Sequence, residues 1–156
     1  MRKGKSKKRY LLPDPRFQEP LVTRFVNNLM VDGKKNKAYK LFYDAIDIVT
    51  EKTTQNGLEV WKKALENVTP QVEVKTRRIG GANYQIPQEV RAERKTALAM
   101  KWLIHYATER KEHSISKGLS SEIIAASKQE GGAFKKREDT HRMAEANKAY
   151  SHFKIK

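Results

Sequence analysis

VEVKTRRIGGANYQIP, at residues 72–87, is the stretch that decides how this chain is organised. Apolar and polar residues alternate on both sides of Gly80-Gly81, which is the pattern of two β-strands joined by a tight turn. Glycine at both turn positions permits positive φ angles and lets another backbone come close. Arg77 and Arg78 stand beside this turn and are expected on opposite faces of the strand. The stretch predicts a β-hairpin at about residues 71–87 with a cationic tip.

Two interpretations of this hairpin are open. It is either an ordinary surface hairpin or a finger that enters a groove of a nucleic acid. In the second case the arginines would contact phosphates and Tyr84 would be available to stack on a base. A two-stranded hairpin is not stable alone, so it must pack against the rest of the chain or against a partner.

The sequence around the hairpin has helical spacing. Apolar residues recur every three or four positions, and prolines and glycines separate the segments. The tryptophans Trp61 and Trp102 lie on such apolar stripes and are expected in the core, with Leu98 and Tyr106 beside Trp102. The six expected helices run from Pro20 to about Asp32, from the basic turn at 32–35 to Asn56, from Leu58 to just before Pro70, from about Gln88 to about Arg110, through 115–123, and from Gly131 to about Lys148.

The predicted fold class is therefore mainly α: a six-helix bundle with one protruding β-hairpin between the third and fourth helices. Residues 1–19 are expected to form a basic, extended N-terminal arm, because Pro13 and Pro15 disfavour helix there. Residues 20–156 are expected to form one helical domain. Six cations occupy the beginning of the arm: Arg2, Lys3, Lys5, Lys7, Lys8 and Arg9.

The charge balance points to a polyanionic partner. The chain of 156 residues has 33 Lys and Arg against 18 Asp and Glu, a net charge of +15. Such a field attracts nucleic acid.

The chain has no cysteine, which excludes disulfides and thiolate chemistry. No apolar run approaches the roughly 20 residues of a membrane helix, and no apolar segment follows the basic start. Neither a membrane partner nor a secretory signal is expected.

Cations also cluster near the starts of two expected helices. Positive side chains are unfavourable beside the positive end of a helix dipole, unless a phosphate docks there. The alternative is pairing within the last helix at i,i+4 spacing, as between Lys135 and Asp139 or Glu138 and Arg142. The fourth helix carries Arg91, Arg94 and Lys95, and the sixth carries Lys135, Lys136 and Arg137.

The sequence offers little catalytic chemistry. His141 and Glu145 have a spacing that can bind a metal, but no third ligand is apparent, and a pair on a helix surface is the simpler interpretation. No nucleotide-binding, zinc-protease or calcium-binding motif is present. We therefore expect no enzyme, no cofactor, no metal and no small-molecule substrate. A DNA-binding architectural protein is the main alternative to an RNA-binding one, and a nucleic-acid enzyme lacks a catalytic carboxylate cluster.

Two long motifs resemble a known family. ENVTPQVEVK at residues 66–75, followed by RRIGG at 77–81 and YQIP at 84–87, is similar to the hairpin signature of the bacterial small-subunit ribosomal protein seven family. GAFKKREDTHRMAEANKA at 132–149 resembles the last helix of that family, and Pro13-Asp14-Pro15 resembles its arm. The similarity runs from about Arg9 to about Phe153. Ala82-Asn83, Phe134 and the ending at 153–156 depart from the usual pattern of the family.

The resemblance implies a structural protein of the small ribosomal subunit, located in the cytoplasm, within the ribosome. It implies primary binding to the three-prime major domain of small-subunit rRNA, nucleation of the head, and a place beside the E site near tRNA and mRNA. Its protein partners would be ribosomal protein eleven and other head proteins. The rRNA-binding residues would be Arg2, Lys3, Lys5, Lys7, Lys8, Arg9, Lys34, Lys35, Lys75, Arg77, Arg78, Arg91, Arg94 and Lys95. The E-site-facing residues would be Arg77, Arg78, Gly80, Gly81, Tyr84, Lys135, Lys136, Arg137, His141 and Arg142.

Overall fold

The computed structural model describes residues 10–153, and the chain divides into two compact units. The first unit ends at Lys40 and the second begins at Leu41, so the division falls within a helix. An arm that ends at residue 19, before a domain at 20–156, stays a prediction.

The first unit contains helix α1 (Pro20–Leu29) and the start of α2. Proline suits the first helical position, because its φ is preset and no hydrogen bond from its nitrogen is needed there. Val22, Phe25 and Val26 are completely buried at helical spacing. The hydroxyl of Thr23, within the helix, donates to the carbonyl of Leu12, before the helix, at 2.8 Å. This bond ties the segment before α1 to the helix itself.

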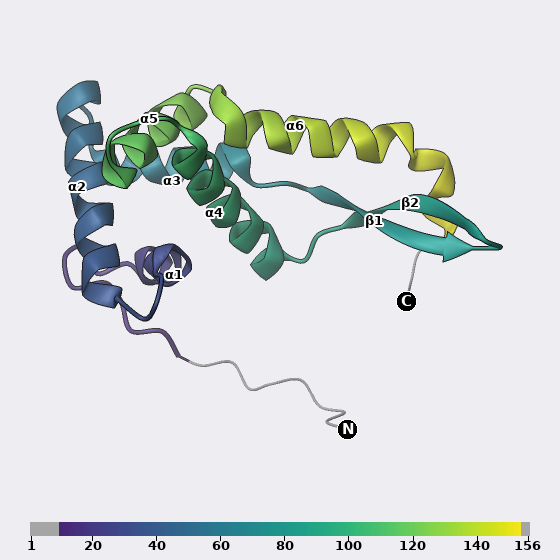
Figure 1. Cartoon of the computed structure of the whole chain (residues 1–156), viewed down its shortest axis with the longest axis horizontal. Coiled ribbons are helices and arrows are strands. Elements are labelled where there is room, and N and C mark those ends of the chain that lie inside the picture. The colour runs from purple at the N-terminus through teal and green to yellow at the C-terminus, as the bar shows by residue number, and fades with distance from the viewer. Residues whose placement is uncertain (1–9, 154–156) are drawn as a thin grey trace. The chain divides into compact units, whose positions relative to one another are not determined.

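The mainly helical fold with a hairpin between the third and fourth helices is confirmed (Figure 1). The strands form a two-stranded antiparallel sheet. The elements after α1 are α2 (Lys35–Thr53), α3 (Gly57–Val68), β1 (Val72–Ile79), β2 (Ala82–Glu89), α4 (Ala92–Glu109), α5 (Ile115–Ser127), α6 (Gly131–Ala146) and the 3₁₀ helix η1 (Lys148–Phe153).

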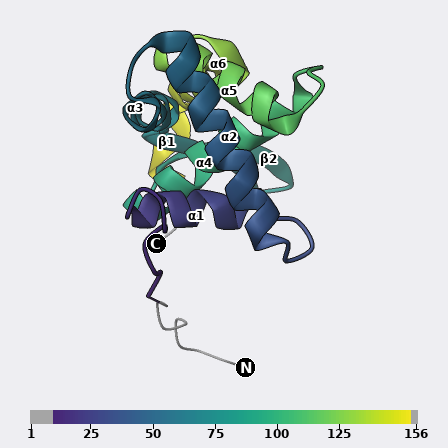
Figure 2. The same ribbon diagram turned by 90° about the vertical axis from the view of Figure 1, so that its left-hand side faces the viewer.

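Helices α3, α4 and α5 pack against one another in the second unit, as Figure 2 shows with α3 viewed nearly along its axis. Trp61 of α3 is completely buried, as expected, and its ring meets Phe42 edge-on at 5.3 Å. Such aromatic pairs prefer this geometry because ring edges are positive and ring faces negative. The other large side chains buried completely in this unit include Val49, Val68, Met100, Leu103, Leu119 and Ile123.

The buried stripe of α4 is displaced by one residue from the predicted one. Trp102, Leu98 and Tyr106 are only half-buried, so the expectation that Trp102 is a core residue was wrong. The buried face instead carries Ala99, Met100, Leu103 and Ala107. Both stripes have helical spacing, and small alanines allow the neighbouring helices to come closer than tryptophan would. Spacing alone could not choose between them.

A buried carboxylate fixes the start of α6. Glu122 on α5 is 1% exposed, and its two oxygens accept hydrogen bonds from the Arg110 side chain at 2.7 Å and from the Ala133 backbone N–H at 2.8 Å. The first N–H groups of a helix lack partners within it, so this carboxylate satisfies one of them. Arg110 supplies the opposite charge that a buried carboxylate needs. One side chain therefore joins α4, α5 and α6.

Two predicted element boundaries differ from the structure. The fourth helix was expected from Gln88, but Gln88 and Glu89 continue β2 and pair with Glu73 and Val72. The ladder satisfies their backbone groups, so the helix begins only at Ala92. The last helix was expected to reach Lys148, but α6 ends at Ala146 and the chain continues as the separate η1.

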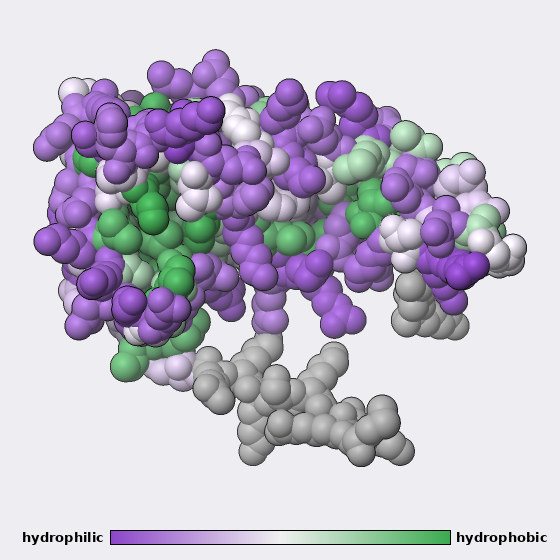
Figure 3. Space-filling model, in the orientation of Figure 1, coloured by the Kyte–Doolittle hydropathy of each residue, from purple (hydrophilic) through white to green (hydrophobic). Residues whose placement is uncertain are grey.

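The hairpin extends away from α3–α5 and runs beside α6 (Figure 1). Its strands keep one register from Val72↔Glu89 at the base to Ile79↔Ala82 at the tip. Apolar residues gather where the strands pass beneath α6, as the green area there in Figure 3 shows, while most of this face of the hairpin and α6 is hydrophilic. No helix within residues 10–153 has the length and apolar character needed to span a membrane.

Candidate nucleic-acid interface

The tip of the hairpin is a two-glycine turn. Gly80 and Gly81 have φ angles of 56° and 89°, the combination that a tight hairpin turn requires and that other residues adopt at a cost. A Cβ atom built at either glycine would meet nothing within 4 Å. Glycine is therefore needed here for its backbone angles, and the space around the turn stays open to another molecule.

Arg77 and Arg78 lie on opposite faces of the hairpin, as expected, because β1 continues to Ile79. Arg78 pairs across the sheet with Asn83, and Arg77 pairs with Tyr84. Both arginines are exposed. Within residues 10–153 the side chain of Arg78 has no hydrogen bond or ion pair, so its charge is available to an external partner.

Arg77 and Tyr84 are in contact with the C-terminal helix η1. The Tyr84 ring lies edge-on to Tyr150 at 5.2 Å and 6.0 Å from the ring of Phe153. Nη1 of Arg77 donates to the Phe153 carbonyl at 3.4 Å. Tyr84 was expected to be available for stacking on a base, but its ring already has two aromatic neighbours.

The cations at the start of α4 face the base of the hairpin. Arg94 forms a 2.9 Å ion pair with Glu73 of β1, and Lys75 reaches the same carboxylate at 3.3 Å. The Lys95 ammonium donates to the Gln71 side chain. Glu73 was not singled out from the sequence, yet its side chain is only 13% exposed and it orients two predicted rRNA-binding residues.

Arg91 occupies a different position from these two cations. It is the N-cap residue of α4, is exposed, and makes no side-chain capping bond. The predicted cluster of cations at this helix start is therefore present. Arg91 is exposed, while Arg94 connects the helix to β1 and Lys95 connects it to the residue before β1.

Arg137 of α6 points into the protein rather than toward solvent. Its Nη1 donates to the Asn67 carbonyl of α3 at 2.7 Å, and its guanidinium lies 4.3 Å from the centre of the Phe134 ring. The Asn67 side chain in turn donates to the carbonyls of Ala126 and Ser127 at the end of α5. Arg137 thereby connects α6 to α3, a role that its position in a basic run did not reveal.

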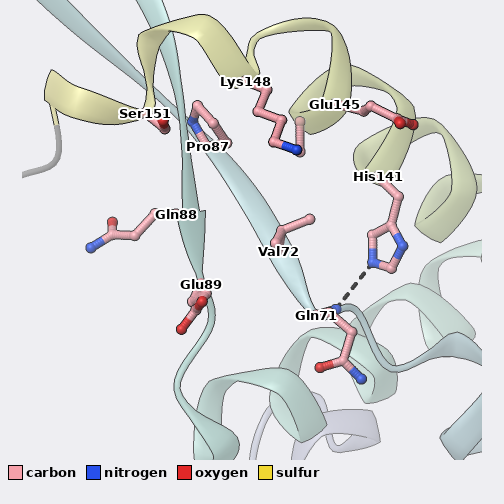
Figure 4. Close-up of a pocket in the computed structure, with 10 residues that line it drawn as sticks. Gln71, Val72, Pro87, Gln88, Glu89, His141, Glu145, Lys148 and Ser151 are labelled. Carbon is pink, nitrogen blue, oxygen red and sulfur yellow. Dashed lines mark hydrogen bonds between the residues drawn. The ribbon is translucent and has the colours of Figure 1, made fainter.

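His141 also faces inward and meets the base of the hairpin. Its Nε2 accepts the Gln71 backbone N–H at 3.0 Å, which requires an imidazole without a proton on that nitrogen (Figure 4). Burial and the nearby Arg137 lower the pKa of His141 below its ordinary value, which favours the same neutral ring. His141 was expected to face the E site, and here it joins α6 to the residue before β1.

The remaining basic residues of α6 are more accessible. Lys135 and Arg142 are exposed and Lys136 is half-buried. Arg142 lies 4.0 Å from Asp139 at i,i+3 spacing, instead of pairing with Glu138. At the start of this helix the Glu122 carboxylate binds the Ala133 N–H, so this one N–H group is already engaged, and phosphate contact there stays a prediction. Nothing in the local sequence of α6 signals this, since Glu122 is on another helix.

Two of the predicted rRNA-binding residues, Lys34 and Lys35, lie in the described part of the first unit. Six others lie outside the described residues. Lys34 is 3.4 Å from Asp32, and the Lys35 ammonium lies 5.7 Å from the centre of the Tyr39 ring. Both lysines are exposed at the start of α2 and line a surface hollow with Gly33, Asn36 and Lys37. The six arm cations, Arg2, Lys3, Lys5, Lys7, Lys8 and Arg9, belong to residues 1–9, which the structure does not describe.

A pocket of about 480 Å³ lies between the base of the hairpin and α6–η1 (Figure 4). Val72 and Pro87 from the strands face Ala144 of α6, and Glu89, Glu145 and Lys148 carry the charges around the opening. His141 and Glu145 were considered as metal ligands, and within residues 10–153 no group of three or more His, Cys, Asp or Glu side chains could hold a metal ion.

The fold and these residues define a basic, mainly helical protein with one cationic hairpin, a class suited to binding nucleic acid. The chain belongs to the ribosomal protein S7p/S5e family, which it matches over residues 1–148.

Curated relatives agree with this family over nearly the whole chain. The small ribosomal subunit protein uS7 of Cytophaga hutchinsonii is 64% identical over 155 residues, covering 99% of this chain and all (100%) of the relative. The protein of the same name from Flavobacterium johnsoniae is 61% identical over 158 residues, with coverage of 99% and 100%. The one from Gemmatimonas aurantiaca is 54% identical over 153 residues, with coverage of 98% of each. The expected family is confirmed.

Proposed function

We propose that this chain binds the three-prime major domain of small-subunit rRNA, nucleates the assembly of the head, and presents its hairpin and α6 at the E site near tRNA and mRNA. Membership of the family makes the chain a ribosomal protein with a structural rather than an enzymatic role in the small subunit. The contacts with this rRNA region, the E-site ligands and ribosomal protein eleven go beyond that membership.

The observation that carries the proposal is the exposed Arg78, whose side chain has no partner within residues 10–153, beside a two-glycine turn with open space around it. An arginine without an internal partner costs little to bring against a phosphate, because no existing ion pair must be broken. Three other predicted contact residues, Arg91, Lys135 and Arg142, are also exposed.

The test is equilibrium binding to an RNA fragment of the three-prime major domain over a range of salt concentrations. Each phosphate contact contributes about 0.7–0.9 to the slope of log affinity against log salt. We expect Arg78→Ala to weaken binding and to lower the slope by about one contact. Arg78→Lys should retain most of the affinity because the charge remains.

Lys63→Ala is the matched control, because Lys63 is an exposed cation of α3 outside the predicted interface. An equal loss of affinity in Lys63→Ala and Arg78→Ala would mean that only total charge matters, which would contradict the proposal. Tighter binding to duplex DNA than to the rRNA fragment would instead favour an architectural DNA-binding protein. Crosslinks from Arg78 and Arg142 to tRNA in assembled subunits would test the E-site assignment.

A further inference from the structure

The hairpin is fastened to the second unit at its base. Here Gln71 donates its backbone N–H to His141, and Glu73 pairs with Arg94 of α4. The Val90 N–H closes the base by donating to the Gln71 carbonyl at 3.1 Å. These bonds hold the first residues of the hairpin but do not fix the direction of the strands beyond them.

A second fastening lies further along the strands. Three aromatic rings, Tyr84, Tyr150 and Phe153, form a cluster that we call the aromatic clamp. Two polar contacts accompany it, from Arg77 to the Phe153 carbonyl at 3.4 Å and between the Asn147 and Gln85 side chains at 3.5 Å. The aromatic clamp joins β2 to η1, and the polar contacts add β1 and Asn147, the residue before η1.

Between the two fastenings is the pocket of about 480 Å³ (Figure 4). Close-packed side chains resist rotation of an element because any tilt creates clashes or voids. Here Val72 and Pro87 face a hollow instead of a filled interior. Packing is therefore incomplete beside Val72 and Pro87, and the contacts of Tyr84 and Arg77 with η1 add to those that α6 makes with both strands.

We propose that Tyr150 and Phe153 are positioning residues that hold the hairpin in one direction through Tyr84 and Arg77, and so determine where Arg78 is presented. Neither residue is in the set predicted to touch RNA. The direction of the hairpin is a property of the protein alone, and only its effect on RNA binding rests on the proposed function.

The direction can be measured with spin labels, since the chain has no cysteine to remove. Ala82→Cys places one label at the hairpin tip and Lys135→Cys places the other on α6, both at exposed positions. Double electron–electron resonance then gives the distribution of distances between them. We expect a narrow distribution in the parent and a broader one after Tyr150→Ala or Phe153→Ala. Tyr150→Phe should restore the narrow distribution, because the ring remains.

Ile115→Ala is the matched control. Ile115 is 43% exposed and Tyr150 is 37% exposed, so each change removes a similarly exposed apolar side chain. Ile115 is on α5, which contacts neither strand within the described chain. The proposal is overturned if Tyr150→Ala keeps the parent distribution, or if Ile115→Ala broadens it as much.

Amide hydrogen exchange separates a loose hairpin from a destabilised protein. In Tyr150→Ala we expect exchange at the β1 and β2 amides to accelerate about two- to tenfold, the range set by one aromatic pair. Amides of α3 and α5 should exchange as in the parent. Equal acceleration in the hairpin and in these helices would mean a general loss of stability and would contradict a positioning role.

The consequence for RNA is tested with the same variants. We expect Tyr150→Ala to weaken binding to the rRNA fragment about two- to tenfold and Tyr150→Phe to restore it. A broadened distance distribution with parental affinity would refute the positioning of Arg78 for RNA. If the parent itself fails to bind this RNA, the proposed function fails, and the distance measurement still decides whether the clamp sets the direction of the hairpin.

Discussion

Adjacent residues of this chain have opposite roles, and the difference arises from strand geometry. Arg77 and Arg78 are chemically identical neighbours, but alternation places one against η1 and the other toward solvent. The same holds on α6, where Arg137 is bonded to Asn67 while Arg142 is exposed. Positive charge in a sequence therefore marks candidates for RNA contact, and only the fold separates those that are already engaged.

His141 makes the attachment of the hairpin sensitive to pH. Its pKa is lowered in the folded protein, so the unfolded chain, with a pKa near 6.5, binds a proton more readily. Stability therefore rises with pH in this range. The contribution is fully present above about pH 6.5 and is lost as the pH falls toward the lower pKa of the folded state. We expect urea unfolding to show a lower free energy of unfolding at pH 5.5 than at pH 7.5.

His141→Gln is the control for this titration, because an amide can accept the Gln71 N–H but does not titrate. Charged groups around His141 include Arg137, Glu138, Arg142 and Glu145 on α6, with Glu89 and Lys148 across the pocket. These groups and the other histidines are common to both proteins, so their effects cancel. An equal fall in stability in the parent and in His141→Gln would assign the pH dependence to groups other than His141.

Among the elements, α6 depends on a side chain from another helix for its start. Replacing Glu122 by Leu would leave Arg110 and the Ala133 N–H without their partner. We expect a loss of about 3 kcal/mol in the free energy of unfolding, the lower end of the range for breaking a buried ion pair, because Arg110 is partly exposed. Glu122→Gln should cost less, since an amide oxygen can still accept the Ala133 N–H. Urea titration of both variants measures the difference, and equal losses would contradict a capping role.

The elements themselves could be predicted because their signals are local. Alternation on both sides of Gly80-Gly81 specified the hairpin, and helical spacing specified the helices that surround it. The register beyond Pro87 was missed, because Gln88 and Glu89 carry no apolar alternation and their pairing is decided by Glu73 and Val72 on the other strand. The buried face of α4 was mispredicted for a similar reason. The helices packed against α4 determine whether Trp102 or Leu103 is buried, and they are not visible in its local sequence.

The candidate interface was predictable in its charge and less so in its contacts. Basic residues at the hairpin tip and at the start of α4 were found from sequence alone. The partners that engage these residues and Arg137 of α6, such as Glu73, Asn67 and Phe153, lie 21 to 76 residues away along the chain. No pattern within a short window could bring these pairs together.

For the molecule as a whole, the net charge of +15 is spread over the arm and the body. Removing residues 1–9 deletes six cations and no acid. We expect the shortened protein to bind the rRNA fragment more weakly and with a smaller dependence on salt, since fewer phosphates are neutralised. Its helix content should match the parent by circular dichroism, because the elements that the structure describes are retained. Unchanged affinity and salt dependence would rule out a role for these cations in RNA binding.

The aromatic clamp also has a consequence for the synthesis of the protein. Arg77 and Phe153 are separated by 76 residues, and a bacterial ribosome adds about 5–20 residues per second during synthesis. Arg77 is therefore added to the growing chain about 4–15 seconds before Phe153. During that interval the newly made hairpin has no Tyr150 or Phe153 to hold it, and its final orientation is acquired only when the last helix has left the exit tunnel.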